Sequence, residues 1–107
     1  MGQFEKVMET RLAKIAEVLS AKRKEYATEK SRYHNFEVAA RKMGCTPEQA
    51  LMGMKVKHTV SIDDLVEWAA DMDPRLTISM IDEKIGDEIN YLILLEGMLK
   101  RGIEGDG

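Results

Sequence analysis

The residues best suited to chemistry are two carboxylates and an amide in the C-terminal part of the chain: Glu83, Asp87 and Asn90. On an α-helix, side chains four residues apart lie one turn apart on the same face, so the two carboxylates would point at one spot. Like charges so close repel each other, which raises one pKa unless a cation lies between them. A divalent cation removes that conflict. Oxygen donors without a nearby Cys or His favour Mg²⁺ or Mn²⁺ over Zn²⁺.

The helix that carries these residues is expected from about Thr77 to Lys100, with Gly102 ending it. One apolar stripe runs along it, formed by Ile78, Ile81, Ile85, Ile89, Leu92 and Leu99. The side that carries the acidic residues is also apolar, with Met80, Tyr91, Leu94 and Met98. A helix that is apolar on both sides is enclosed by other helices or by a second subunit. We therefore expect the two carboxylates at the edge of, or inside, an apolar environment, where a buried charge needs a partner.

Two simpler alternatives remain open. Glu83 would pair with Lys84 or Lys30 on a solvated rim, since perturbed or paired carboxylates also occur in structural ion-pair networks. A second carboxylate pair at helical spacing, Glu25 and Glu29, would form intrahelical salt bridges. The lysines that flank this second pair are Lys22, Lys24 and Lys30. Four carboxylates from two antiparallel helices would instead make a metal cluster in the core of a bundle.

Helix formers dominate the 107 residues, strict apolar alternation is absent, and only Pro47 and Pro74 interrupt the chain. This pattern predicts an all-α fold, a bundle of four to five helices. Beside the C-terminal helix, we expect helices over about 4–27, about 35–43 and 47–58. From Ser61 to Asp71 the last of these continues, or a new helix begins. Residues 1–101 are expected to form a single domain, and residues 102–107 a flexible Gly-rich tail.

Two boundaries have specific local signals. Gly44 suits the left-handed residue that ends a helix. The run Thr46-Pro47-Glu48-Gln49 begins the next helix, with Thr46 as N-cap, Pro47 at the first helical position and Gln49 closing a capping box.

Composition excludes several classes of protein. The chain is 44% hydrophobic and 33% charged, which is too apolar for a disordered chain and too charged for a membrane protein. Its net charge of −3 argues against a stable nucleic-acid complex. The single cysteine, Cys45, excludes an intrachain disulfide and fits a reducing compartment. We expect a cytoplasmic protein with no membrane contact.

The charge is unevenly distributed. Residues 1–60 hold 12 basic and 7 acidic residues, whereas residues 61–107 hold 4 basic and 12 acidic residues. Solvated helix faces explain most of these charges. The asymmetry also allows an anionic ligand between a basic wall and an acidic, cation-binding wall.

Four short motifs follow one another in a distinctive order. They are Lys24-Glu25-Tyr26, Asn35-Phe36 with Ala39-Ala40, Met54-Lys55-Val56-Lys57-His58, and Glu83-x-x-x-Asp87-x-x-Asn90-Tyr91. Over about residues 20–99, their order and spacing resemble the short, often phage-encoded relatives of the MazG-like all-α NTP pyrophosphatases. The resemblance implies a helical bundle completed by oligomerisation, as a homodimer or a higher homo-oligomer. It implies Mg²⁺ (or Mn²⁺) bound by carboxylates of two helices, and hydrolysis of nucleoside triphosphates to the monophosphate and pyrophosphate.

The resemblance also implies roles for individual residues. Glu83 and Asp87 match the late metal-ligand pair and are the expected catalytic residues, while Glu25, and less closely Glu29, match the early ligands. The residues expected to contact the nucleotide are Arg32, Asn35, Lys55, Lys57, Asn90 and Tyr91. Two features depart from the family pattern: the early pair has one residue more between its members, and Lys84 stands where a second late glutamate is usual. The second departure would weaken the metal site or leave it degenerate.

Three functions therefore compete. The leading one is a metal-dependent nucleotide pyrophosphohydrolase. The second is a non-catalytic helical-bundle interaction or regulatory protein with a degenerate metal site, which would dimerise through Met-rich faces. A basic-patch nucleic-acid binder is the third, and the net charge disfavours it. The two histidines, His34 and His58, lie in different segments and are expected to be structural.

Overall fold

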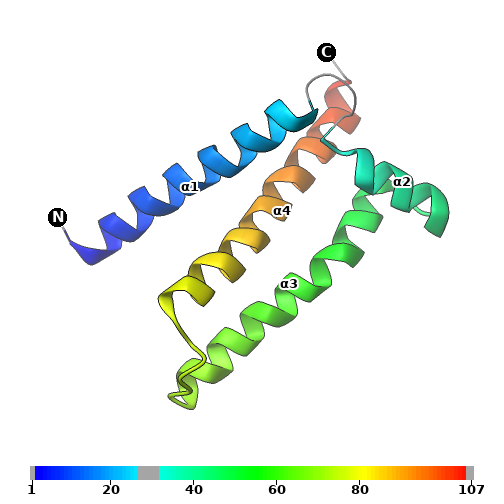
Figure 1. Cartoon of the computed structure of the whole chain (residues 1–107). Coiled ribbons are helices and arrows are strands. Elements are labelled where there is room, and N and C mark those ends of the chain that lie inside the picture. The colour runs from blue at the N-terminus through cyan, green and yellow to red at the C-terminus, as the bar shows by residue number, and fades with distance from the viewer. Residues whose placement is uncertain (1, 27–31, 106–107) are drawn as a thin grey trace.

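The structure is a computed structural model that describes residues 2–26 and 32–105, and within these residues it is all-helical (Figure 1). The helices are α1 (Gln3–Tyr26), α2 (His34–Met43), α3 (Pro47–Ala70) and α4 (Ile78–Glu104). The predicted all-α fold is confirmed, and the described residues form four of the four to five expected helices. The segment from Ser61 continues the helix that begins at Pro47. None of the helices in the described part is both long and apolar enough to span a lipid bilayer.

Both local signals between α2 and α3 act as predicted. Gly44 ends α2 in the left-handed region at φ 69°. Thr46 caps α3: its Oγ1 accepts a hydrogen bond from the Gln49 backbone N–H at 3.1 Å, and the Gln49 Oε1 accepts one from the Thr46 N–H at 2.9 Å. Because these contacts are made within four residues of sequence, they form without help from the rest of the fold.

Replacing Thr46 by alanine removes the side-chain half of this box. We expect Thr46→Ala to lower the free energy of unfolding by about 1 kcal/mol, the usual loss for an N-cap. Urea denaturation followed by circular dichroism measures the difference. Thr46→Ser keeps the hydroxyl and should stay close to the wild type; equal losses in both variants would contradict a capping role.

The end of α4 differs from the prediction. The helix passes through Gly102 and ends at Glu104, where Gly105 takes φ 85° and its N–H donates to the Arg101 carbonyl at 2.8 Å. A glycine inside a helix costs only about 1 kcal/mol relative to alanine, so Gly102 alone does not stop it. The helix closes where a glycine adopts the positive φ.

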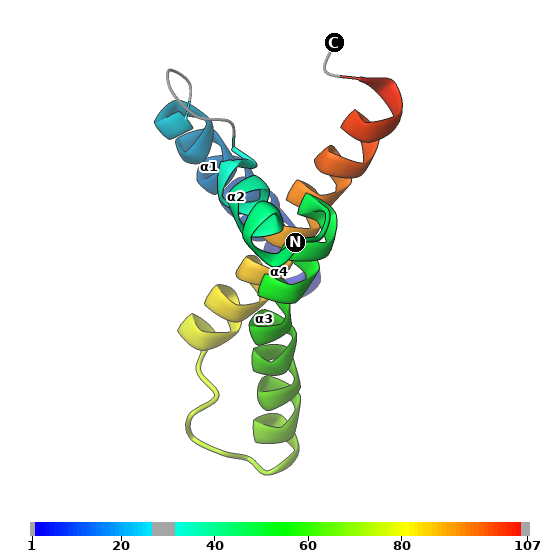
Figure 2. The ribbon, with the colours of Figure 1, turned by 90° about the vertical axis from the view of Figure 1, so that its right-hand side faces the viewer.

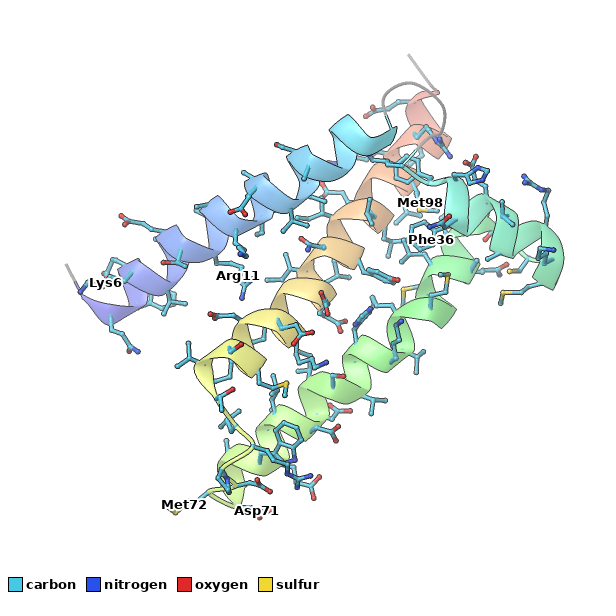
Figure 3. All side chains as sticks on the ribbon, in the orientation of Figure 1. Lys6, Arg11, Phe36, Asp71, Met72 and Met98 are labelled. Atoms are coloured by element: carbon cyan, nitrogen blue, oxygen red, sulfur yellow. The ribbon has the colours of Figure 1, made fainter. Side chains whose placement is uncertain are left out.

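The central element is α4, which lies between α1 and α3 (Figure 1). Within the described residues, α1 packs against α4 and against no other helix, whereas α3 packs against both α4 and α2. The core forms where α2, α3 and α4 meet, around Phe36, Leu51 and Met98. Figure 3 shows Phe36 and Met98 close together at this junction. The fold is therefore anchored at one end of α4.

An ion pair is buried between α3 and α4. The Lys55 ammonium contacts the Glu88 carboxylate and donates to the Thr59 hydroxyl at 3.1 Å. The Lys55 and Glu88 side chains keep only 11% and 18% of their accessible surface. Since a charge removed from water needs its partner, this pair specifies how the two helices align.

Several apolar side chains stay uncovered in a single chain. On α1, Phe4 and Leu12 are 71% and 61% exposed, and on α4, Ile78 and Leu99 are 74% and 53% exposed. The radius of gyration is 16.2 Å, against about 13 Å for a compact domain of this length. Figure 2 shows the open arrangement, with the C-terminal end of α4 diverging from α1 and α2. On the second apolar side of α4, Met98 is buried and Tyr91 and Leu94 pack against the core, whereas the stripe that carries Ile78 and Leu99 is not fully covered by one chain.

The turn between α3 and α4 is held by Asp73. Its carboxylate accepts hydrogen bonds from the Arg75 backbone N–H at 2.9 Å and from the Arg75 Nη2 at 2.8 Å. The same guanidinium lies 4.8 Å from the centre of the Trp68 ring. The Arg75 side-chain hydrogen bond is the main cause that lowers the pKa of Asp73.

Because the folded pKa of Asp73 is lowered, its contribution to stability is present above the unfolded pKa. That contribution is lost as the pH falls through the folded value. Carboxyl-carbon NMR titration should give Asp73 a pKa below that of an ordinary aspartate, and Arg75→Gln should raise it. If Arg75→Gln leaves the pKa of Asp73 unchanged, Arg75 is not the cause of the lowered value.

Candidate functional site

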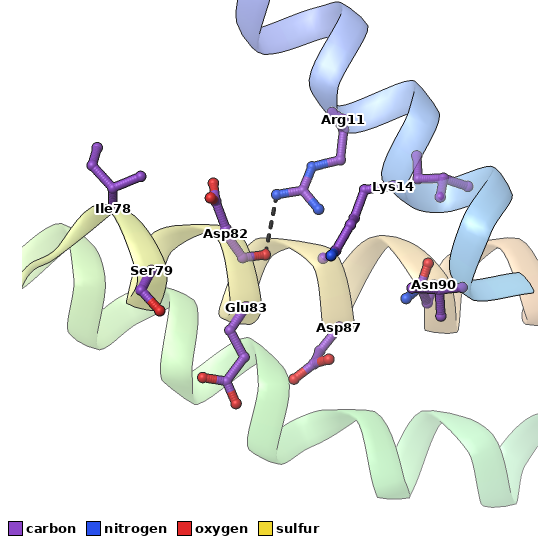
Figure 4. A pocket seen from close by; sticks show the side chains of 11 residues that line it. Arg11, Lys14, Ile78, Ser79, Asp82, Glu83, Asp87 and Asn90 are labelled. Atoms are coloured by element: carbon purple, nitrogen blue, oxygen red, sulfur yellow. Dashed lines mark hydrogen bonds between the residues drawn. The ribbon is translucent and has the colours of Figure 1, made fainter.

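Two adjoining cavities run along α4. The first, of about 590 Å³, lies between α1 and α4 and is lined by Arg11, Lys14, Ile15, Val18, Ile78, Ser79, Asp82, Glu83, Gly86, Asp87 and Asn90 (Figure 4). The second, of about 280 Å³, is lined by Val18, Leu19, Arg32, Asn35, Phe36, Asp87, Asn90, Tyr91 and Leu94. We call them the charged groove and the aromatic pocket. They share Val18, Asp87 and Asn90, so they form one continuous hollow.

The two predicted catalytic carboxylates lie on the floor of the charged groove. In Figure 4 the side chains of Glu83 and Asp87 point the same way, away from α1. Glu83 is exposed, and the Asp87 side chain keeps 41% of its accessible surface. Neither carboxylate lies inside an apolar environment in a single chain, whereas Asp87 lies at the edge of one, beside Tyr91 and Leu94 of the aromatic pocket.

A histidine of α3 lies beside Asp87. The Nδ1 atom of His58 is 3.8 Å from the Asp87 Oδ2 atom, and the imidazole packs edge-on against Tyr91 with ring centroids 4.7 Å apart. The sequence analysis assigned His58 a structural role only. Its position beside Asp87 becomes apparent only once α3 and α4 are aligned.

Four of the predicted nucleotide-contacting residues line the aromatic pocket: Arg32, Asn35, Asn90 and Tyr91. The Tyr91 ring also meets Phe36 edge-on, with centroids 5.8 Å apart. Burial, with a smaller effect of the Asp87 carboxylate, raises the pKa of Tyr91. The phenol therefore stays neutral at physiological pH and keeps its proton for hydrogen bonding.

Asn90 lies on the wall that both cavities share. Its Oδ1 atom is buried and accepts no hydrogen bond from the residues that the structure describes. Because a buried acceptor without a partner is costly, a ligand that donates to this oxygen would be favoured.

The two predicted phosphate-binding lysines of α3 line neither cavity. The ammonium of Lys55 is committed to Glu88 and Thr59, and Lys57 is exposed two residues further along the helix. A helix presents residues two apart on different faces, so α3 cannot aim both at one ligand.

The cations that face the groove come from α1 instead. Arg11 and Lys14 line the wall beside the acidic residues, and the Arg11 Nη2 donates to the Asp82 carbonyl at 3.1 Å. Sequence reasoning did not single out either residue. Their three-residue spacing puts them on one face of α1, but only the packing of α1 on α4 shows what that face meets.

The predicted early ligands, Glu25 and Glu29, belong to the C-terminal end of α1 and the segment that follows it in sequence. The expectation of antiparallel helices is wrong, because α1 and α4 run in the same direction: Arg11 lies beside Asp82, and Val18 lies beside Asn90. The chain returns through α2 and α3 before α4 begins. Glu25 belongs to the last turn of α1, about 10 Å further along the axis than Val18. Its side chain, and Glu29 altogether, lie outside what the structure describes.

The donors present suit Mg²⁺ or Mn²⁺. Within residues 2–26 and 32–105, no group of three His, Cys, Asp or Glu side chains is arranged to hold a metal ion. Glu83 and Asp87 nevertheless offer carboxylate oxygens one turn apart on an open face. Mg²⁺ is commonly held by one or two carboxylates together with substrate phosphates and water, so this pair fits a metal that arrives with a phosphorylated ligand.

Comparison with known proteins gives no relative. No protein-family model matches this chain, and neither a curated protein nor a solved structure is similar to it.

Proposed function

We propose that this chain is a metal-dependent nucleoside triphosphate pyrophosphohydrolase of the MazG-like kind, which converts an NTP or dNTP to the monophosphate and pyrophosphate. The observation that supports this proposal is that residues far apart in sequence come together along one hollow. Six residues singled out from sequence, in segments some fifty positions apart, line the two adjoining cavities: Arg32, Asn35, Glu83, Asp87, Asn90 and Tyr91.

The aromatic pocket suits a nucleoside. Phe36 and Tyr91 supply aromatic surface, Asn35 and the unpaired Asn90 oxygen supply hydrogen-bonding groups, and Arg32 supplies a positive charge at the rim. Mostly apolar walls with a few polar groups are typical of small-molecule sites. The α-phosphate of a nucleotide bound here would lie near Asp87, which borders both cavities.

The reaction needs little covalent chemistry from the protein. Mg²⁺ or Mn²⁺ held by Glu83 and Asp87 would offset the charge that develops on the phosphates. Glu83 and Asp87 position a water for attack on the α-phosphorus, and one of their carboxylate oxygens accepts its proton. The bond from that phosphorus to the bridging oxygen breaks, and pyrophosphate leaves. His58, next to Asp87, helps to hold that carboxylate in place.

A second copy of the chain is part of the proposal. Phe4, Met8 and Leu12 form an uncovered apolar face on α1, and Ile78 and Leu99 lie exposed on α4. Burying such surface drives association. A homodimer or larger homo-oligomer that covers these faces would also restrict the access of water to the open carboxylates.

The test is a turnover assay on the purified chain. Each of the common NTPs and dNTPs is incubated with Mg²⁺ or Mn²⁺, and released pyrophosphate and monophosphate are measured together. We expect equal amounts of the two products from at least one nucleotide, and none with EDTA. No metal-dependent turnover on any nucleotide would reject the proposal.

A non-catalytic interaction protein with a degenerate metal site is the second candidate. The exposure of Glu83 and the uncovered apolar face of α1 favour it. It predicts oligomerisation without turnover. Analytical ultracentrifugation beside the turnover assay therefore separates the two functions.

A further inference from the structure

The hollow along α4 has two ends of different chemistry. One end, the aromatic pocket, is lined by Phe36 and Tyr91; the other, the charged groove, has Arg11 and Lys14 on the α1 wall. Only Asp87, Asn90 and Val18 belong to both. A ligand that extends past this junction would therefore meet apolar and amide groups at one end and charged groups at the other.

The guanidinium of Arg11 is placed across α4 by a close fit. It donates to the Asp82 carbonyl, which is a neutral acceptor, so its charge is not offset by that contact. A side-chain carbon at Gly86 would lie 2.7 Å from the Arg11 Nη1 atom, closer than real contacts allow. Because this atom is the far end of a flexible side chain, a Cβ at Gly86 would displace the guanidinium from its present position without disturbing the helix. A guanidinium has five N–H donors, so most stay available to a ligand.

No ion pair joins Arg11 or Lys14 to another residue in the described ranges. The α4 side of the groove is formed by Asp82, Glu83 and Asp87. The Glu83 and Asp87 carboxylates point away from α1 (Figure 4), so a divalent cation held by them would lie at the edge of the groove and would offset the negative charge that an entering phosphate meets there. The groove is thus suited to an anion that arrives as its metal complex.

We propose that the charged groove is the subsite for the pyrophosphate end of the nucleotide, with Arg11 and Lys14 as its anion-binding residues and Gly86 as the residue that positions Arg11. The inference rests on the proposed function, and it fixes the direction of the ligand. The nucleoside lies toward α2, and the β- and γ-phosphates lie toward the N-terminal end of α4. From Asp87 to Asp82 the helix rises about 7.5 Å, which accommodates a diphosphate.

The experiment measures binding of inorganic pyrophosphate with Mg²⁺, and separately of nucleoside monophosphates, by isothermal titration calorimetry. We expect Arg11→Gln to weaken pyrophosphate binding at least tenfold, since charge-assisted hydrogen bonds are lost. Monophosphate binding should change less than twofold. Lys42→Gln, the same charge change on an exposed residue of α2, is the matched control.

Gly86→Ala tests the same subsite without removing a charge. Alanine is the better helix former, so α4 should keep its stability. The new methyl group displaces the guanidinium from its present position, and pyrophosphate binding should weaken, though less than in Arg11→Gln because the charge is kept. Circular dichroism verifies the helix content of each variant.

The outcomes separate this inference from the proposed function. Pyrophosphate binding that is sensitive to Arg11 and Gly86, without turnover of any nucleotide, supports the subsite and rejects the enzyme. Turnover with pyrophosphate binding that neither variant changes rejects the subsite and leaves the enzyme in place. Equal losses of pyrophosphate and monophosphate binding in Arg11→Gln also reject the subsite.

Discussion

Asp87→Asn should reduce metal-dependent turnover by about 10³-fold, the range expected when a residue that acts in proton transfer or metal binding loses its charge. Asp87 borders both cavities and lies 3.8 Å from His58. Asparagine keeps nearly the same shape but offers one neutral oxygen in place of a carboxylate. The thermal unfolding midpoint should stay within a few degrees of the wild type, because the side chain is 41% exposed.

The control is Asp63→Asn, the same change at an exposed position of α3 that lines neither cavity. It should turn over nucleotide at the wild-type rate. An active wild type whose Asp87→Asn variant keeps a third or more of the rate would show that the chemistry lies elsewhere on the chain.

Lys55→Met should cause the largest loss of stability, about 2 to 3 kcal/mol in urea unfolding. Removing one partner of a buried ion pair typically costs 3–5 kcal/mol, since the other charge is left without compensation. Here the loss is smaller, because Glu88 keeps 18% of its surface and the Thr59 hydroxyl still contacts its Oε1 atom at 3.2 Å. The double variant Lys55→Met with Glu88→Leu should recover most of the loss.

Lys57→Met is the matched control, two residues along the same helix and exposed. It should change the free energy of unfolding by less than about 0.5 kcal/mol. Turnover in the double variant decides what Lys55 does. A wild-type turnover rate would show that Lys55 serves only the α3–α4 interface. Loss of turnover with restored stability would show that Lys55 binds the nucleotide.

The local features of the fold were predictable from sequence because their causes are local. Gly44 and the Thr46–Gln49 box act within a few residues, and the structure has both. The end of α4 was predicted at Gly102, but the helix ends before Gly105, which adopts the positive φ. Two glycines so close in sequence offer the same local signal, so the sequence alone does not distinguish them.

The site was predictable only in part. Asn90 and Tyr91 lie next to Asp87 in sequence and helix phase, so spacing alone brings them together. Lys55 meets Glu88 across 33 positions, and Arg11 meets Asp82 across 71. Such contacts depend on how whole helices align, which periodicity does not encode. The direction of α1 relative to α4 likewise depends on how whole helices align.

In the part of the chain that the structure describes, α1 packs on α4 alone, and this has a thermodynamic consequence. A helix held on one side is the first cooperative unit to detach when a domain opens locally. Because Arg11 and Lys14 are carried by α1, detachment of this helix would dismantle the cationic wall while α2, α3 and α4 stay folded. Occupancy of the groove and attachment of α1 are therefore linked equilibria: whatever binds there stabilises the N-terminal helix by the same free energy with which that helix favours binding.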